Sequence, residues 1–229
     1  MAKQKFKIIP FMVVILLLGG LYISVFQAKR MVKSFSSQAD PVKIVIEEVD
    51  QENTHLKYLQ VEGLVNRLVQ NDINKQITNE AIAFKEPIEE TGHSVDVNYS
   101  LEFNKNHILS LTLVESHYRK VAAHPMHYMK AMTMNTKTGQ VYQLVNLFKT
   151  KSDYQPRLTA IINQQIIDKG LQLFKPFEGV TADQEFYLTA DSIVIYYQLY
   201  YYTPYVYGFL KFNIPYGQVA DIMHRDFIQ

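Results

Sequence analysis

The sequence contains no cysteine and no excess of charge of either sign, and both features exclude classes of protein. Without a thiol, the chain forms no disulfide and offers no attachment point for the lipid anchor of a lipoprotein. The 23 basic and 22 acidic residues leave a net charge of +1, whereas a nucleic-acid binder would show a basic excess or patch. Stability must therefore come from packing, for which the 16 Tyr and 13 Phe are the main source.

Motifs for nucleophilic catalysis and for phosphate binding are also missing. The sequence has no Gly-x-Ser-x-Gly elbow and no glycine-rich phosphate loop. Carboxylates come in pairs at Glu47-Glu48, Glu89-Glu90 and Asp183/Glu185, and a glycan hydrolase could use such pairs at a separation of about 5–9.5 Å. Neighbouring side chains on a strand point to opposite faces, however, so solvated positions are the better interpretation. We expect no catalytic residues and no enzyme activity.

Three histidines, His117, His124 and His127, lie near Glu115 in the sequence and resemble a metal-ligand pattern. A zinc site needs three or four ligands that converge, with supporting hydrogen bonds around them. Pro125 predicts a turn into a strand, and on a strand residues three apart face opposite sides. We therefore expect no metal and no cofactor here.

The N-terminus carries the one long hydrophobic run. Lys3, Lys5 and Lys7 precede the segment from Ile8 to Phe26, which contains no charged residue. At 1.5 Å per residue this segment reaches about 28 Å, close to the thickness of a bilayer core. A cleaved signal peptide has a shorter apolar region, and a core helix that is apolar on every face would need a larger protein around it. We expect a cytoplasmic stub at 1–7, an uncleaved transmembrane anchor at 8–26, a tether at 27–40 and an extracytoplasmic body.

The body is predicted to have an α+β fold, an antiparallel sheet with two main packed helices. Alternating or β-branched runs predict strands at 42–49, 55–61, 94–103, 107–118, 126–134, 185–188, 193–198 and 208–214. The spacing of Leu64, Leu68, Ile73 and Ile77 predicts one helix. A second is predicted from Tyr154 to about Phe174, capped by Asp153, and a short final one at 216–223. The three strands between 94 and 134 should form an antiparallel meander.

Two parts of the body resemble known families. The segments Phe186–Tyr197, Thr203-Pro204-Tyr205 and Phe212–Tyr216 are similar to the sensing region of RsiV-like, lysozyme-responsive anti-sigma factors. Upstream, the segments 108–110, 122–125, 138–139 and 144–148 resemble the N-terminal domain of PdaC-like peptidoglycan deacetylases. We therefore divide the body into a PdaC-like subdomain at 41–150 and an RsiV-like subdomain at 151–229.

These resemblances imply an α+β fold and a binding role in the cell envelope. We do not expect the output function of either family in this chain. Residues 1–7 are too short for a domain that holds a sigma factor, and the RsiV-like part runs to Gln229, so we expect no metal-dependent deacetylase domain after it.

The most unusual composition lies between Tyr196 and Tyr207, where most residues are tyrosine. One interpretation is that these tyrosines fill a small core, and for residues 196–200 both this interpretation and a binding role stay open. Exposed tyrosines serve protein interfaces and sugar-stacking surfaces, because each ring gives a large contact area at low entropic cost. A proline-fixed loop favours that second interpretation. The candidate ligand-binding residues, completed by two loop residues of the upstream resemblance, are Tyr201, Tyr202, Pro204, Tyr205, Tyr207, His124 and Pro125.

The sequence thus predicts a single-pass membrane protein whose body binds an envelope partner, either a lysozyme-like protein or peptidoglycan. One alternative is a structural or assembly protein of the envelope that docks another membrane protein. A glycan-modifying enzyme is the third.

Overall fold

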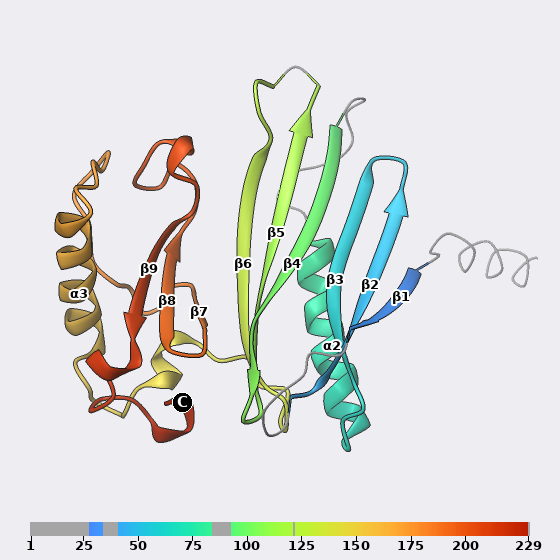
Figure 1. Cartoon of the computed structure of the whole chain (residues 1–229), viewed down its shortest axis with the longest axis horizontal. Helices are drawn as coiled ribbons and strands as arrows, with labels where there is room; N and C mark the ends of the chain where they lie inside the picture. Colours follow the sequence, from blue (N-terminus) through green and yellow to red (C-terminus); the bar gives the residue numbers. More distant parts are fainter. Residues whose placement is uncertain (1–27, 34–40, 84–92, 121, 229) are drawn as a thin grey trace, which may run out of the picture.

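The computed structural model describes residues 28–33, 41–83, 93–120 and 122–228 (Figure 1). The expected stub and transmembrane anchor lie outside the described residues. Among the helices that are described, none has both the length and the apolar character needed to cross a bilayer. The α+β prediction is confirmed, because the described chain folds into two sheets and two main helices.

The larger sheet has six strands in sequence order. They are β1 (Ala28–Lys33), β2 (Lys43–Gln51), β3 (Thr54–Glu62), β4 (His93–Lys105), β5 (Ile108–Arg119) and β6 (Met126–Asn135). The predicted meander of β4, β5 and β6 is confirmed as antiparallel. Strands β3 and β4 pair in parallel, since a parallel pair needs a long crossover and the helix between them provides it.

Strand β1 corrects part of the expected tether. Residues 28–33 pair antiparallel with β2, from Ala28 opposite Val49 to Lys33 opposite Ile44. The tether prediction is therefore wrong for these six residues. Strand pairing needs only backbone groups, and β2 would otherwise leave a row of them unpaired at the sheet edge. A polar segment without alternation can fill that role.

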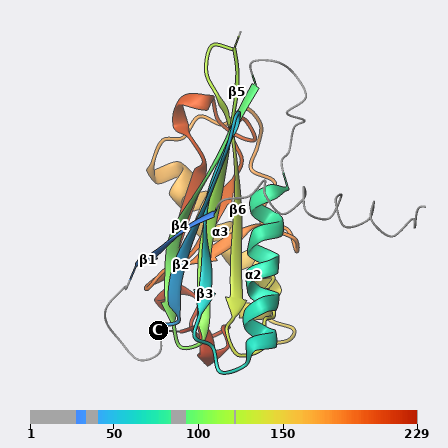
Figure 2. The same cartoon turned by 90° about the vertical axis from the view of Figure 1, so that its right-hand side faces the viewer.

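Helix α2 (Arg67–Ile82) covers one face of this sheet (Figure 2). The Asn66 side chain caps it by accepting the backbone N–H groups of Leu68 and Val69 at 3.0 and 3.3 Å. Ile73 and Ile77 are buried as predicted. Leu68, expected on the same stripe, is exposed, because it lies nine residues before Ile77 and so on the opposite face of the helix. Val69, four residues before Ile73, packs against the core instead.

The smaller sheet contains β7 (Phe186–Leu188), β8 (Ser192–Tyr197) and β9 (Leu210–Pro215), all antiparallel. It lies next to β6, with α3 (Tyr154–Asp168) on its far side (Figure 1). Short 3-10 turns lie between β6 and α3 at Leu144–Leu147 and between β8 and β9 at Tyr205–Tyr207, and two more follow β9 at Tyr216–Gln218 and Arg225–Phe227.

Two helix boundaries and one helix cap differ from the prediction. Helix α3 ends at Asp168 rather than near 174, because Gly170 adopts a φ of +59° that breaks the helix. The Asp153 side chain makes no capping hydrogen bond. The expected final helix is only the turn Tyr216–Gln218.

The core around the smaller sheet includes residues from both sides of position 150. Phe103, Ile108 and Leu147 pack into the same buried cluster as Phe212 and Ile214. A buried hydrogen bond also joins the halves, from the Leu188 N–H to the Ser110 hydroxyl at 2.9 Å. The two predicted subdomains therefore share a core.

Candidate functional site

A cluster of tyrosine and histidine side chains forms where the loop between β5 and β6 meets the loop after β8. We call Tyr200, Tyr205, His124 and His127 the tyrosine-histidine cluster. The ring of His124 stacks on Tyr205 with centroids 3.9 Å apart and planes 26° apart. The Tyr205 hydroxyl donates to the Pro125 carbonyl at 2.9 Å. These contacts fix both loops against each other.

Hydrogen bonds define the state of His124. Its Nδ1 lies 2.9 Å from the Pro125 carbonyl, which can only accept, so Nδ1 carries a proton. In the neutral ring Nε2 is then an acceptor, and the Tyr200 hydroxyl lies 3.3 Å from it. Tyr200 adopts a φ of +64°, which is uncommon for a side chain of this size. The cluster is therefore held in one arrangement before any ligand arrives.

His127 supports the cluster from β6. Its ring stacks on Tyr205 at 6.1 Å, and its Nδ1 lies 2.7 Å from the Ser116 hydroxyl. Burial lowers the pKa of His127, and the charge of nearby His124 lowers it further. A neutral His127 is thus favoured next to the tyrosine.

The loop that carries Tyr205 is short and well bonded. The turn Tyr205–Tyr207 closes through the Tyr207 N–H to the Pro204 carbonyl at 3.0 Å and the Gly208 N–H to the Tyr205 carbonyl at 2.9 Å. Gly208 has a φ of +66°, a conformation that glycine adopts without strain. Val206 at the tip is 85% exposed, and Tyr207 is also exposed. The loop presents apolar surface to the outside.

The structure divides the predicted binding residues. Tyr205, His124 and Pro125 are brought together, as the candidate set requires. Tyr202 is only 2% exposed, its hydroxyl accepts the Glu178 N–H at 3.2 Å, and its ring packs on Tyr197. The expectation that Tyr202 is an exposed binding ring is therefore wrong, because the chain turns this side chain into the core.

Tyr201 lies away from the tyrosine-histidine cluster, near Tyr197 and Tyr202. It is 48% exposed, and the Lys175 ammonium lies 4.4 Å from its ring centroid. Pro204 is half-buried and precedes the turn. Tyr201 and Tyr205 thus belong to different surfaces despite their short separation in sequence.

Sequence reasoning missed Tyr200 and His127. Both occur in segments that the sequence singles out, but the expectation that residues three apart on a strand face opposite sides separated His127 from His124. His124 lies before the start of β6, so that alternation does not apply to it. Tyr200 lies after the end of β8, so strand alternation does not predict its orientation either.

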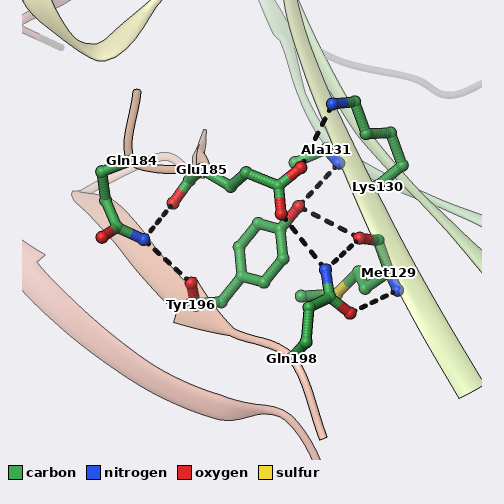
Figure 3. A network of polar contacts seen from close by, with 7 residues as sticks. All are labelled: Met129, Lys130, Ala131, Gln184, Glu185, Tyr196 and Gln198. Carbon is green, nitrogen blue, oxygen red and sulfur yellow. Dashed lines mark hydrogen bonds and ion pairs between the residues drawn. The ribbon is translucent and has the colours of Figure 1, made fainter. Parts of the chain in front are cut away.

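A cleft lies between the two sheets, beside a network of polar contacts (Figure 3). Its volume is about 570 Å³, and its walls come from α2, β6, residues 141–144 and residues 182–186. In the network, the Tyr196 hydroxyl accepts the Ala131 N–H at 3.0 Å and donates to the Met129 carbonyl at 3.3 Å. Gln198 bonds the Met129 N–H at 3.0 Å and the Met129 carbonyl at 2.6 Å.

Charged groups complete this network. Glu185 accepts from Lys130 and from Gln198, each at 3.1 Å. Burial strongly raises the pKa of Tyr196, and the charge of Glu185 raises it further. The network fixes the smaller sheet to β6 and so sets the shape of the cleft.

The structure also places the other titratable groups considered from the sequence. Within the described ranges, no group of three or more His, Cys, Asp or Glu side chains is arranged to hold a metal ion. His117 contacts Glu115 in a buried position, and its ring packs edge-on against His93 and Tyr128. Glu47 is buried while its neighbour Glu48 pairs with Lys57 at 2.7 Å. The pair Glu89-Glu90 lies outside the described residues.

Comparison with known proteins supports the RsiV-like part of the sequence interpretation. Residues 145–217 match the family described as "Protein of unknown function (DUF3298)". The chain is 26% identical over 200 residues to anti-sigma-V factor RsiV of Bacillus subtilis (strain 168), covering 77% of this chain and 67% of RsiV. The chain therefore contains an RsiV-like domain, while the PdaC-like assignment of the upstream half stays a prediction.

Two solved structures have the same fold. A DUF3298 family member from Bacteroides fragilis NCTC 9343 matches with a TM-score of 0.57 and 14% identity, covering 88% of this chain and 96% of that one. A DUF3298 family protein from Pseudomonas aeruginosa PAO1 matches with a TM-score of 0.61 and 11% identity, covering 89% and 94%. At such identities the likeness is one of fold.

Proposed function

We propose that this chain is a membrane-anchored extracytoplasmic module that binds a cell-envelope partner, either a lysozyme-like protein or peptidoglycan. The uncharged run from Ile8 to Phe26 supports the anchor. The identity to an anti-sigma factor supports a sensing or binding role for the folded body. The module acts by contact and not by catalysis.

The observation that carries the proposal is the tyrosine-histidine cluster. Tyr200 and His124 are exposed, and Tyr205 is fixed by a stacked ring and a hydrogen bond before binding. Aromatic side chains dominate the energy of protein interfaces. Rings that are already ordered lose little conformational entropy on association. This surface therefore has the composition and the rigidity of a binding site.

The direct test measures binding of the full chain, in detergent micelles, to immobilised lysozyme and to purified peptidoglycan. Replacing Tyr200 and Tyr205 together by alanine should weaken binding by about tenfold or more, the loss typical of interface hot spots. Tyr201→Ala is the matched control, since it removes an exposed ring outside the cluster. Equal binding of the double variant and the unchanged chain would refute the assigned surface.

The same experiment separates the remaining alternatives. If neither lysozyme nor peptidoglycan binds and another membrane protein is captured through the cluster, the chain is an assembly protein. Hydrolysis or deacetylation of peptidoglycan that one carboxylate or histidine substitution abolishes would establish an enzyme instead.

A further inference from the structure

The outer edge of β6 is only partly covered by the rest of the protein. In a strand, the N–H and C=O of one residue point to the same side, and neighbouring residues alternate. At Met129 both groups bond to Gln198. Further along, the Thr133 carbonyl accepts the Tyr142 N–H at 2.7 Å, and the Asn135 N–H donates to the Gln140 carbonyl at 2.8 Å. The backbone N–H and C=O groups of the odd-numbered residues of β6 therefore point to the outer edge.

Two backbone groups on this edge lie between the covered stretches. They are the carbonyl of Ala131 and the N–H of Thr133. The other backbone group of each residue points to the same edge and is bonded: the Ala131 N–H donates to the Tyr196 hydroxyl, and the Thr133 carbonyl accepts the Tyr142 N–H. No hydrogen-bond partner for these two groups is found among residues 41–83, 93–120 and 122–228. Both residues line the cleft. The neighbouring segment leaves the edge here, because a 3-10 turn begins at Leu144.

The walls of the cleft carry an excess of negative charge. Glu80 comes from α2, and Asp183 and Glu185 come from the loop before β7. Lys130 is the one basic side chain among the lining residues, and it already pairs with Glu185 at 3.1 Å. A hydrogen bond from the Thr181 side chain lowers the pKa of Asp183, which keeps that carboxylate charged. The cleft therefore favours a cationic occupant.

We propose that the cleft binds a short extended peptide that carries a lysine-type ammonium group. Its central residue lies opposite Met132, donates its N–H to the Ala131 carbonyl and accepts the Thr133 N–H. This is strand addition at a sheet edge, in which backbone bonds give affinity and side-chain pockets give selectivity.

The register also places the cationic side chain. Residues opposite each other on neighbouring strands project to the same face, and Met132 packs in the core that contains Ile73 and Ile77 of α2. The side chain of the central residue therefore projects toward α2, where Glu80 lines the cleft. At about 570 Å³ the cleft is within the usual range for a small-ligand site. This site goes beyond the proposed function, since no member of the tyrosine-histidine cluster lines it.

The test uses acetyl-Ala-Lys-Ala-amide and the isotope-labelled full chain in micelles. On titration, the amide signal of Thr133 should shift in the nuclear magnetic resonance spectrum, and its hydrogen exchange should slow. A peptide methylated on the lysine backbone nitrogen cannot donate to Ala131, so it should bind about tenfold more weakly or worse. Replacing the lysine by norleucine removes only the charge and should weaken binding about fivefold.

Protein variants complete the test. The double variant Glu80→Gln with Asp183→Asn should lose about fivefold in peptide affinity. Glu52→Gln, on the exposed β2–β3 turn, should bind like the unchanged chain. A Tyr200→Ala and Tyr205→Ala variant should also keep full peptide binding, which separates this proposal from the proposed function. The proposal is overturned if the N-methylated peptide binds as well as the parent, or if the Thr133 signal does not respond.

Discussion

Replacing Tyr196 by phenylalanine tests how the smaller sheet is held on β6. Tyr196 is 1% exposed, and its hydroxyl bonds two backbone groups of the neighbouring strand (Figure 3). Phenylalanine keeps the ring and its packing, so the substitution opens no large cavity. Only the hydrogen bonds are removed.

The magnitude follows from which groups lose their partners. The Met129 carbonyl keeps the Gln198 amide at 2.6 Å, so it remains satisfied. The Ala131 N–H loses the only hydrogen-bond acceptor that the described residues provide for it. Ala131 is half-buried, and the loss of such a hydrogen bond costs about 0.5–1.5 kcal/mol. We expect the free energy of unfolding to fall by that amount. For a chain of this size, this lowers Tm by about 1–6 °C.

Urea unfolding of the full chain in mild detergent, followed by circular dichroism, measures the effect. The midpoint should decrease while the slope stays constant, because the surface exposed on unfolding does not change. Tyr207→Phe is the control, since Tyr207 is exposed, and it should change stability by less than about 0.5 kcal/mol. A Tyr196→Phe loss no larger than that of the control would refute the role given to this hydroxyl.

Two further predictions follow from the same contacts. Tyr202→Ala should lower the free energy of unfolding by about 3–5 kcal/mol because it removes a buried ring, whereas Tyr201→Ala should cost far less, and similar losses in urea unfolding would contradict the division between them. The pKa of His127 is lowered from its ordinary value of 6.5, so the unfolded chain takes up the proton at a higher pH than the folded one. The contribution of His127 to stability is therefore fully present above pH 6.5 and is lost as the pH falls through the folded pKa. His127→Gln should reduce the change of the urea midpoint between pH 7.5 and pH 5. If the midpoint of the variant depends on pH as strongly as that of the unchanged chain, another group is responsible.

Alternation in the sequence predicted most strands because neighbouring side chains of a strand project to opposite faces, which here have different surroundings. Leu109, Leu111 and Leu113 of β5 pack toward α2, while Ser110 bonds the smaller sheet on the other face. Alternation does not specify which strand pairs with which. The parallel pairing of β3 with β4 depends on the crossover through α2, so it could not be predicted from either strand alone.

The binding surface was only partly predictable, because its residues lie in irregular loops. Along a strand the periodicity tells which ring faces inward, but Tyr201, Tyr202 and Tyr205 follow the end of β8. Their orientations depend on local hydrogen bonds, such as the one from the Phe174 N–H to the Tyr202 carbonyl at 2.8 Å. The sequence could therefore identify the tyrosine-rich loop without telling Tyr202 from Tyr205.

The absence of native cysteine allows a direct test of where the body resides. Val206→Cys places a single thiol at the exposed tip of the loop that carries Tyr205. A maleimide that does not cross membranes should label this variant in intact bacterial cells, or after opening of an outer membrane where one is present. Labelling that requires rupture of the cytoplasmic membrane would contradict an anchored module whose aromatic surface meets its partner outside the cell.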